Sequence, residues 1–440
     1  MDKTIEIKIE KMIPGGKGMG YHDGKVVFAD YCVAGDQVVL NVTKEKKKFI
    51  TGDIATIKEP SPQRIDPECV YFSSCGGCSL WHIDYDTELA YKKEWFIETL
   101  DRIGKVKVDD VRMFPAPNVN NYRNRVQFKV RMLNGRLLFG FNKRGTTRVV
   151  NIGSCMIANE RINEQIAPTK KMLKALSFSD KVQQIDFIVD DANAMVTMLI
   201  HIASGRADGA RGELKRLFKE NIGDGVKPFL QFGRKSTITP LFDDDADVMI
   251  NYTLTNKAGD FKFPLAVSPG SFLQVNYAQN QTLIDIVLEY LSPCVDDEIL
   301  DLFCGAGNFS FAVAQFCKSV TGIESYGPAV VDAKSNMERL NVGNVEFIRS
   351  EVSREVDKFT ESGASFDAAI IDPPREGARS ALKDINNIIK KKIIYISCDM
   401  ATFARDTAFL SSVGFELGRV SLVDMFPRTH HVEVVAEFTR

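Results

Sequence analysis

From Ser268 onward the chain alternates short apolar segments with helical ones, and this alternation constrains its fold more than any other feature. EILDL, SVTGIE, FDAAII and KIIYIS have the length and composition of buried strands, and helical periodicity follows each of them. Strands that alternate with helices form a parallel sheet. We therefore predict an α/β fold with a Rossmann-like domain over residues 266–440, in which ligands bind at the carboxyl ends of the strands.

The first of these strands leads into a glycine turn. In EILDLFCGAGNFSFAVAQF, Gly305 and Gly307 occupy the turn, and Glu324 ends the next strand, seventeen residues after Gly307. An acid at that position can accept hydrogen bonds from a ribose. Ser310 stands where the dinucleotide fingerprint has its third glycine, so the pattern favours an adenosine cofactor without a pyrophosphate, of which S-adenosylmethionine is the common example.

Two further strands deliver reactive groups to the same edge. SFDAAIIDPPREG ends in Asp372 followed by two prolines, and Asp372 can accept a hydrogen bond from a base N–H or simply cap the turn. IIYISCDMATFARD presents Cys398 at the end of its strand. A thiol at this edge is a candidate nucleophile, and the alternative is a small buried apolar side chain.

Residues 1–60 have a different pattern, with period-two hydrophobicity between glycine clusters, which predicts a small β-barrel. The segment GGKGMGYHDGKVVFADYCVAGDQVVLNVTKEKKKFITGDI resembles the TRAM domain, an OB-like barrel of RNA-modifying enzymes. This resemblance implies RNA binding by a basic groove with exposed aromatic residues.

Residues 61–265 are predicted to form a central α+β domain that begins with a cysteine cluster. Cys69, Cys75 and Cys78 are closely spaced on a glycine-rich loop, and Cys155 is the best candidate for a fourth ligand. Four thiolates can hold zinc or an iron–sulfur cluster, and the absence of paired C-x2-C motifs favours iron–sulfur.

The same domain contains a stretch without acidic residues. From Val111 to Asn159 there are nine Lys or Arg and no Asp or Glu, although the whole chain has a net charge of −2. Its alternating pattern predicts antiparallel strands that turn at Asn134-Gly135. We expect these strands to present a positive surface to RNA, with Phe128, Phe139 and Phe141 as candidate base-stacking residues.

Five ordered motifs now carry a resemblance that covers essentially the whole chain. FLQVN, DLFCGAGNFS, IDPPREG, SCDMATFARD and FPRTHHVE resemble those of the RNA uracil-5-methyltransferase family. The barrel and the cysteines resemble the branch that methylates 23S ribosomal RNA and carries a 4Fe–4S cluster. The resemblance implies S-adenosylmethionine-dependent C5-methylation of a uridine through a covalent bond between a cysteine and uracil C6.

The resemblance also implies residue roles. Cys398 would be the nucleophile and Glu433 the base that removes the C5 proton. The expected contacts to cofactor or target base are Gln274, Phe303, Asn308, Glu324, Glu351 and Asp372, and the expected cluster ligands are Cys69, Cys75, Cys78 and Cys155. Two positions depart from the family pattern: Glu351 stands where many members have Asn, and Met400 where Pro is usual.

Composition indicates the location. With nine cysteines, no apolar run long enough to span a bilayer and no signal-peptide core, we expect a cytoplasmic protein without a membrane partner. We also expect it to be a monomer. Three alternatives remain: an adenine N6-methyltransferase that uses the Asp-Pro-Pro-Arg turn, a tRNA uracil-5-methyltransferase, and a non-catalytic or redox-sensing RNA-binding protein.

Overall fold

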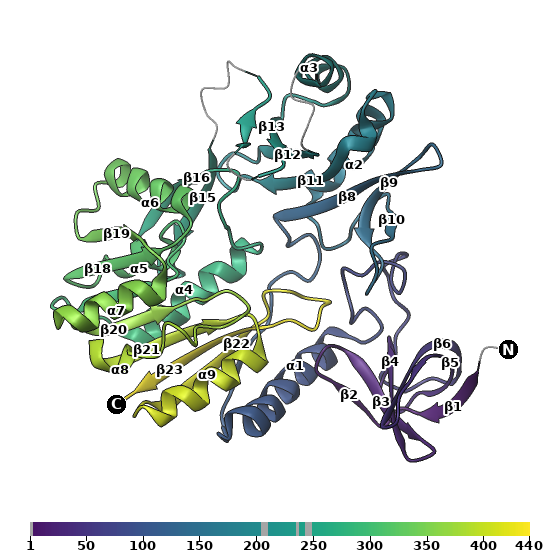
Figure 1. Cartoon of the computed structure of the whole chain (residues 1–440), viewed down its shortest axis with the longest axis horizontal. Coiled ribbons are helices and arrows are strands. Elements are labelled where there is room, and N and C mark those ends of the chain that lie inside the picture. Colours follow the sequence, from purple (N-terminus) through teal and green to yellow (C-terminus); the bar gives the residue numbers. More distant parts are fainter. Residues whose placement is uncertain (1–2, 204–209, 235–236, 243–248) are drawn as a thin grey trace.

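The computed structural model describes residues 3–203, 210–234, 237–242 and 249–440. Its strands form a six-stranded sheet near the N-terminus, a seven-stranded central sheet, a two-stranded hairpin and an eight-stranded C-terminal sheet. Figure 1 shows the three larger parts arranged around a shared centre, where the long loop before β23 reaches toward the other two.

The eight-stranded sheet confirms the predicted Rossmann-like fold. Its order is β19-β18-β17-β20-β21-β23-β22-β7, with parallel pairing from β19 to β21 and an antiparallel β23 between β21 and β22. The strands are β7 (Arg112–Phe114), β17 (Glu298–Leu302), β18 (Ser319–Glu324), β19 (Val345–Arg349), β20 (Phe366–Ile371), β21 (Ile389–Ser397), β22 (Glu416–Val423) and β23 (Glu433–Thr439).

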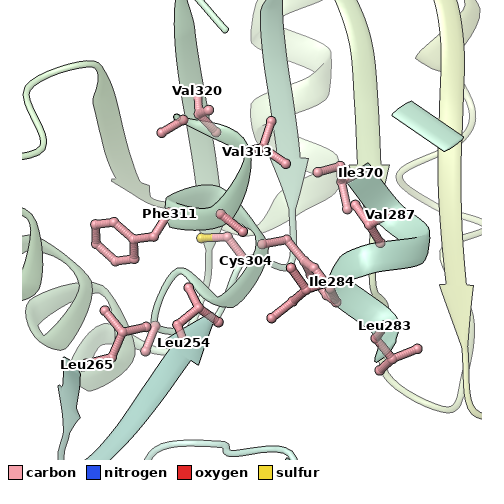
Figure 2. Close-up of a cluster of buried hydrophobic side chains, with 14 of the residues drawn as sticks. Leu254, Leu265, Leu283, Ile284, Val287, Cys304, Phe311, Val313, Val320 and Ile370 are labelled. Atoms are coloured by element: carbon pink, nitrogen blue, oxygen red, sulfur yellow. The ribbon is translucent and has the colours of Figure 1, made fainter. Parts of the chain in front are cut away.

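Helices cover both faces of this sheet, each over its own apolar core. One core contains α4 (Tyr277–Leu291), α5 (Asn308–Val313) and α6 (Gly327–Leu340), and Figure 2 shows the Cys304 thiol among its side chains. The other contains α1 (Tyr85–Thr99), the π-helix Leu100–Gly104, α7 (Val352–Ser362), α8 (Ile385–Ile388) and α9 (Met400–Ser412). Burial on both faces explains the continuous apolar runs AAII in β20 and IIYI in β21.

The central sheet has the order β10-β9-β8-β11-β12-β13-β14. Its strands are β8 (Arg125–Leu133), β9 (Arg136–Asn142), β10 (Val149–Asn151), β11 (Val182–Val189), β12 (Val196–Ile202), β13 (Val226–Phe232) and β14 (Thr239–Pro240). Helices α2 (Glu160–Ala175) and α3 (Ala210–Asn221) and the short 3₁₀ helix Ser179–Lys181 accompany it, and β15 (Ile250–Thr255) and β16 (Lys262–Val267) form the hairpin that follows.

The predicted hairpin of basic strands is confirmed. β8 and β9 pair antiparallel, and Asn134 and Gly135 turn between them with φ of 49° and 74°, the left-handed values of a tight hairpin turn. The stacking prediction is wrong for Phe128 and Phe139, because both are 0% exposed and belong to the apolar core of this sheet. Only Phe141 is partly exposed.

The N-terminal sheet has the order β1-β5-β6-β4-β3-β2 and curls back on itself. Its strands are β1 (Thr4–Lys8), β2 (Lys11–Ile13), β3 (Lys17–His22), β4 (Lys25–Asp30), β5 (Gln37–Glu45) and β6 (Phe49–Glu59). The Glu10 N–H donates to the Met19 carbonyl at 2.8 Å, and a Cβ on Gly20 would lie 2.3 Å from the Lys8 carbonyl oxygen. Glycine at position 20 therefore permits the close approach that rolls the sheet.

The domain division 1–60, 61–265 and 266–440 stays a prediction. α1 packs in the core of the eight-stranded sheet, and β7 pairs with β22 at its edge, so part of the segment between the barrel and the central sheet lies with the C-terminal sheet. Among the described residues, no helix is long and apolar enough to cross a membrane.

Candidate active site

Cys398 lies at the carboxyl edge of the sheet, as the sequence predicts. It follows the last residue of β21 directly and precedes Asp399, which caps α9 by accepting hydrogen bonds from the Ala401 and Thr402 N–H groups at 3.0 and 2.9 Å. The thiol is partly buried. Burial raises the pKa of Cys398 to about 12, the nearby Glu433 also raises it, and Arg375 opposes the shift.

Glu433 is the neighbour of Cys398 across the sheet. The antiparallel register pairs Ser397 with Val434, so the next step brings Cys398 beside Glu433, the first residue of β23. Glu433 is 5% exposed. Burial raises the pKa of Glu433 to about 8, with a further contribution from Asp372 and an opposing one from Arg375. A carboxyl group with a pKa near neutrality is suited to general acid–base chemistry.

Asp372 completes this group. It follows β20 directly, and its N–H donates to the Leu302 carbonyl at 3.3 Å, which ties the Asp-Pro-Pro turn to the end of β17. Burial raises the pKa of Asp372 to about 7. Three acidic groups from β20, β21 and β23 thus lie at one edge of the sheet, and the exposed Arg375 is the positive charge near them.

The glycine turn follows the last residue of β17. Gly305 and Gly307 have φ of 56° and 92°, and the Gly305 N–H donates to Glu324 Oε2 at 3.2 Å. The Tyr326 N–H donates to Glu324 Oε1 at 2.6 Å. Both carboxylate oxygens of Glu324 are thereby fixed at the tip of β18, beside the turn. Phe303 opens the turn with φ of 65°, a strained value for a bulky residue and one often found at functional sites.

Ser310 makes a buried hydrogen bond, which explains why serine replaces the third glycine of the dinucleotide-binding pattern. Its hydroxyl donates to Asp301 Oδ2 at 2.5 Å, and Asp301 is 0% exposed. Burial raises the pKa of Asp301 to about 7, and the hydrogen bond from Ser310 opposes that shift. A glycine at position 310 could not satisfy this buried carboxyl group.

The other predicted contact residues are more dispersed. Asn308 exchanges two side-chain amide hydrogen bonds with Asn280 of α4, at 2.9 and 3.0 Å. Glu351 is exposed and caps α7, accepting from the Arg354 N–H at 3.2 Å, and its hydrogen bond from Ser353 lowers its pKa. Gln274 is partly buried in the loop before α4. Their roles toward cofactor or base stay predictions.

A cavity of about 580 Å³ lies between Arg375 and the cysteine loop. Its lining includes Arg375 and His431 from the C-terminal sheet, Arg123 and Arg125 from the central part, and the four cysteines at positions 69, 75, 78 and 155. Burial raises the pKa of Cys75 to about 11, and the nearby thiols of Cys155 and Cys69 also raise it. The structure therefore gathers the four predicted ligands around one space.

Their arrangement is not that of a finished metal site. Across the described residues, no group of three or more His, Cys, Asp or Glu side chains has the geometry to hold a metal ion. All the cysteines are free of disulfides.

Two of the predicted basic residues hold parts of the protein together. Arg125 donates from Nη1 to the Ser271 carbonyl at 2.9 Å and pairs with the buried Asp186 at 3.8 Å. Arg144 donates to the Gly15 carbonyl at 2.8 Å in the N-terminal sheet. The positive surface expected of this stretch is thus smaller than the sequence implies.

The motif FPRTHHVE marked the loop between β22 and β23, but the sequence assigned no role to its histidines or to Asp424. His430 and His431 have ring centroids 4.1 Å apart, and both line a second cleft together with Cys398. Lys92 of α1 is buried against Asp424 at the start of the same loop. The Glu88–Lys92 spacing was the available signal, but such i, i+4 pairs are common on exposed helix surfaces.

Comparisons with known proteins agree with this geometry. The family model described as tRNA (uracil-5-)-methyltransferase matches residues 84–439. The 23S rRNA (uracil(1939)-C(5))-methyltransferase RlmD of Methylococcus capsulatus is 31% identical over 100% of this chain and 97% of that protein. The enzyme of the same description from Shewanella halifaxensis is 30% identical, over 100% and 96%.

A solved structure matches the fold along its whole length. The crystal structure of Pyrococcus abyssi tRNA (uracil-54, C5)-methyltransferase in complex with S-adenosyl-L-homocysteine has a TM-score of 0.73 and 24% identity, and it covers 99% of this chain and 100% of that chain. Since the family model spans most of the chain and the relatives cover all of it, this protein belongs to the tRNA (uracil-5-)-methyltransferase family.

Proposed function

We propose that the protein is an S-adenosylmethionine-dependent enzyme that methylates C5 of a uridine in 23S ribosomal RNA through a covalent cysteine–uracil intermediate. The observation that carries the proposal is the meeting of Cys398, Glu433 and Asp372 at one sheet edge, each with a raised pKa. The full-length relatives named for 23S rRNA support the substrate.

Each residue then has a task that its chemistry suits. Uracil C5 is a weak nucleophile, and attack of the Cys398 thiolate at C6 gives C5 carbanion character. S-adenosylmethionine, when bound, supplies the electrophilic methyl group. Glu433 accepts the C5 proton after the transfer, the electron pair of that C–H bond forms the C5=C6 bond, and the bond from Cys398 Sγ to C6 breaks. Asp372 accepts a hydrogen bond from the uracil N–H.

The glycine turn and Glu324 are the proposed site for the adenosine part of the cofactor. The support is the carboxylate of Glu324, which is held beside Gly305 at the tip of β18, where a ribose binds in Rossmann-like folds. Gln274, Phe303, Asn308 and Glu351 are the further proposed contacts. Of these, Asn308 must give up its amide pair with Asn280 to bind a ligand through its side chain.

We propose that Cys69, Cys75, Cys78 and Cys155 hold a 4Fe–4S cluster. The support is that all four line one cavity, an arrangement that structural cysteines scattered in a core would not require. Such a cluster is bound by thiolates. Protein purified without oxygen should contain about four irons per chain and absorb visible light. Stoichiometric zinc, or iron retained after Cys78→Ser and Cys155→Ser together, would refute this assignment.

RNA binding is proposed for the TRAM-like N-terminal sheet and the basic hairpin, whose exposed cations include Arg131 and Arg136. We also propose that the protein is a monomer and that it is located in the cytoplasm, where bacteria such as those of the named relatives make ribosomal RNA. The salt dependence of RNA binding measures how many phosphates the protein neutralises.

The decisive test uses RNA that contains 5-fluorouridine. Fluorine at C5 cannot leave as a proton, so enzyme, S-adenosylmethionine and this RNA should form a covalent adduct that survives denaturation. Cys398→Ala should form none and should lose methyl transfer, whereas Cys294→Ala, which changes an exposed cysteine outside the site, should behave as the wild type. Full methyl transfer by Cys398→Ala would instead favour an adenine N6 mechanism.

The substrate is tested separately. 23S ribosomal RNA and tRNA from cells that lack the gene should be offered to the purified protein, and methylated uridines mapped. Methylation of tRNA alone would make the protein a tRNA enzyme, and binding of RNA and cofactor without transfer would favour a non-catalytic role.

A further inference from the structure

A fully buried set of charges joins α1 to the loop between β22 and β23. Lys92 Nζ donates to Glu88 Oε1 at 2.6 Å and to Asp424 Oδ1 at 2.7 Å, and all three side chains are 0% exposed. Lys92 Nζ also donates to the Phe426 carbonyl at 3.3 Å. One lysine of the helix thus holds two positions of the loop.

Other groups hold the positions next to them. Tyr85 of α1 donates its hydroxyl to Asp424 Oδ2 at 2.8 Å, and the Arg428 N–H donates to Glu88 Oε1 at 2.8 Å. The Tyr122 hydroxyl donates to the Pro427 carbonyl at 3.0 Å. Residues 424, 426, 427 and 428 are therefore all fixed by hydrogen bonds to groups outside the loop.

The backbone conformation of Arg428 shows that these hydrogen bonds hold the loop in one particular path. Its φ is 67°, in the left-handed region that a non-glycine residue seldom adopts. Its carbonyl accepts from the Ser79 and Leu80 N–H groups at 2.9 and 3.1 Å. Since Ser79 follows Cys78, the loop is tied on its other side to the segment that carries the cysteines.

The loop ends at Glu433, so the path fixed at Arg428 sets where that carboxyl group begins. Four residues separate the two, and β23 starts at Glu433 itself. Buried ion pairs seldom stabilise a fold more than apolar side chains of the same size would. Buried ion pairs can, however, select one conformation among several. Here the conformation is that of the loop leading to Glu433, the proposed catalytic base.

We propose that Lys92, with Glu88 and Asp424, is a positioning device for Glu433 in the reaction, a proposal that rests on the proposed function. Lys92 acts through the loop and does not touch the substrate. The step it serves is removal of the C5 proton by Glu433, after which Cys398 leaves C6. When Glu433 is displaced, methyl transfer still occurs but the methylated covalent intermediate persists.

The test compares variants that change the network in different ways. Lys92→Met leaves the buried Asp424 without a cation and Glu88 with only Arg428, at 3.8 Å, and can destabilise the protein strongly. The triple variant Glu88→Gln/Lys92→Met/Asp424→Asn removes all three charges and keeps the side-chain sizes. Tyr85→Phe removes the hydroxyl that donates to Asp424 and accepts from the Ala116 N–H at 2.7 Å, and it leaves the three charges in place. It supplies the second measurement if the triple variant does not fold.

Lys392→Met is the matched control. It removes a lysine that pairs with the buried Glu437 at 3.2 Å, on β23 but four residues beyond Glu433. Thermal melts and binding of S-adenosylhomocysteine establish that each variant is folded before its kinetics are measured with ordinary uridine RNA.

We expect kcat to fall on the order of 10²-fold in the triple variant, as for a misplaced catalytic group. Because the slowed step follows the irreversible methyl transfer, KM should fall with kcat, and kcat/KM should change little. Tyr85→Phe should show a smaller fall of the same kind. Denaturing gels should show a methylated protein–RNA adduct in both variants and not in Lys392→Met, a result that lower stability alone would not produce.

A folded triple variant, or a folded Tyr85→Phe if the triple variant does not fold, that turns over as the wild type without adduct would overturn the proposal. A fall in kcat without adduct would also overturn it, because the defect would then lie before proton removal. The proposed function fails in a different way, namely if the wild type itself transfers no methyl group or forms no adduct with 5-fluorouridine RNA.

Discussion

Replacing Glu433 by Gln should make the protein more stable while it abolishes turnover. Glu433 is 5% exposed, and burial raises the pKa of its carboxyl group to about 8. Because ionisation is disfavoured in the folded state, folding is opposed wherever the unfolded chain would already carry the charge. Glutamine has nearly the same shape and no charge to bury.

The size of the effect follows from linkage between proton binding and folding. With a folded pKa raised above the unfolded one, the site is neutral in both states at low pH, and stability is lost as pH rises from the unfolded pKa to the folded one. Taking about 4.5 for the unfolded carboxyl group and about 8 for the folded one, the unfolding free energy of the wild type falls by about 3–4 kcal/mol between pH 5 and pH 8 through this group alone.

Urea unfolding of wild type and Glu433→Gln at pH 5 and pH 8 measures this difference. Other titrating groups are common to both proteins, so the variant should gain about 3–4 kcal/mol over the wild type on going from pH 5 to pH 8. Glu437→Gln is the control on the same strand. Burial favours a higher pKa for Glu437, but hydrogen bonds from Arg419 and Lys392 prevail and lower it, so that variant should lose stability at both pH values. An equal advantage of Glu433→Gln at pH 5 and pH 8, or none, would refute the reasoning.

Three further changes test other parts of the structure. Glu324→Ala should weaken S-adenosylhomocysteine binding by about 1.5–3 kcal/mol in calorimetry, since it removes a charged acceptor; unchanged affinity would exclude a cofactor contact. Gly20→Val should lower the melting temperature, because its Cβ would lie 2.3 Å from the Lys8 carbonyl oxygen; an unshifted melt would contradict the sheet closure. Gly212→Ala, at an open position in α3, should stabilise by about 0.5–1 kcal/mol.

The parallel sheet could be predicted because short apolar runs alternate with helical segments, and the groups at its edge because they follow those runs directly. Cys398 and Asp372 are the first residues after β21 and β20, and Glu324 is the last of β18. The turn at Asn134-Gly135 could also be predicted from the sequence, since both residues adopt positive φ readily.

The tertiary uses of polar residues could not be predicted. Lys92 lies in an ordinary charged helix sequence, and only the packing of α1 against the loop before β23 makes it buried. Arg125 and Arg144 looked like part of an RNA surface, but each donates to a carbonyl of a distant segment. Alternation along a strand indicates which residues share a face, and it does not indicate what that face meets.

The raised pKa values at the sheet edge belong to the free protein, and binding of a charged ligand can change them. Cys398, Glu433 and Asp372 have pKa values raised to about 12, 8 and 7, all chiefly by burial, so the free protein disfavours the thiolate and carboxylates that the chemistry needs. A cation bound among them favours their charged forms. S-adenosylmethionine is a sulfonium cation and S-adenosylhomocysteine is neutral, so we expect the substrate form of the cofactor to favour ionisation of Cys398 and the product form to reverse it. The nucleophile would then be activated chiefly when a methyl group is available for transfer.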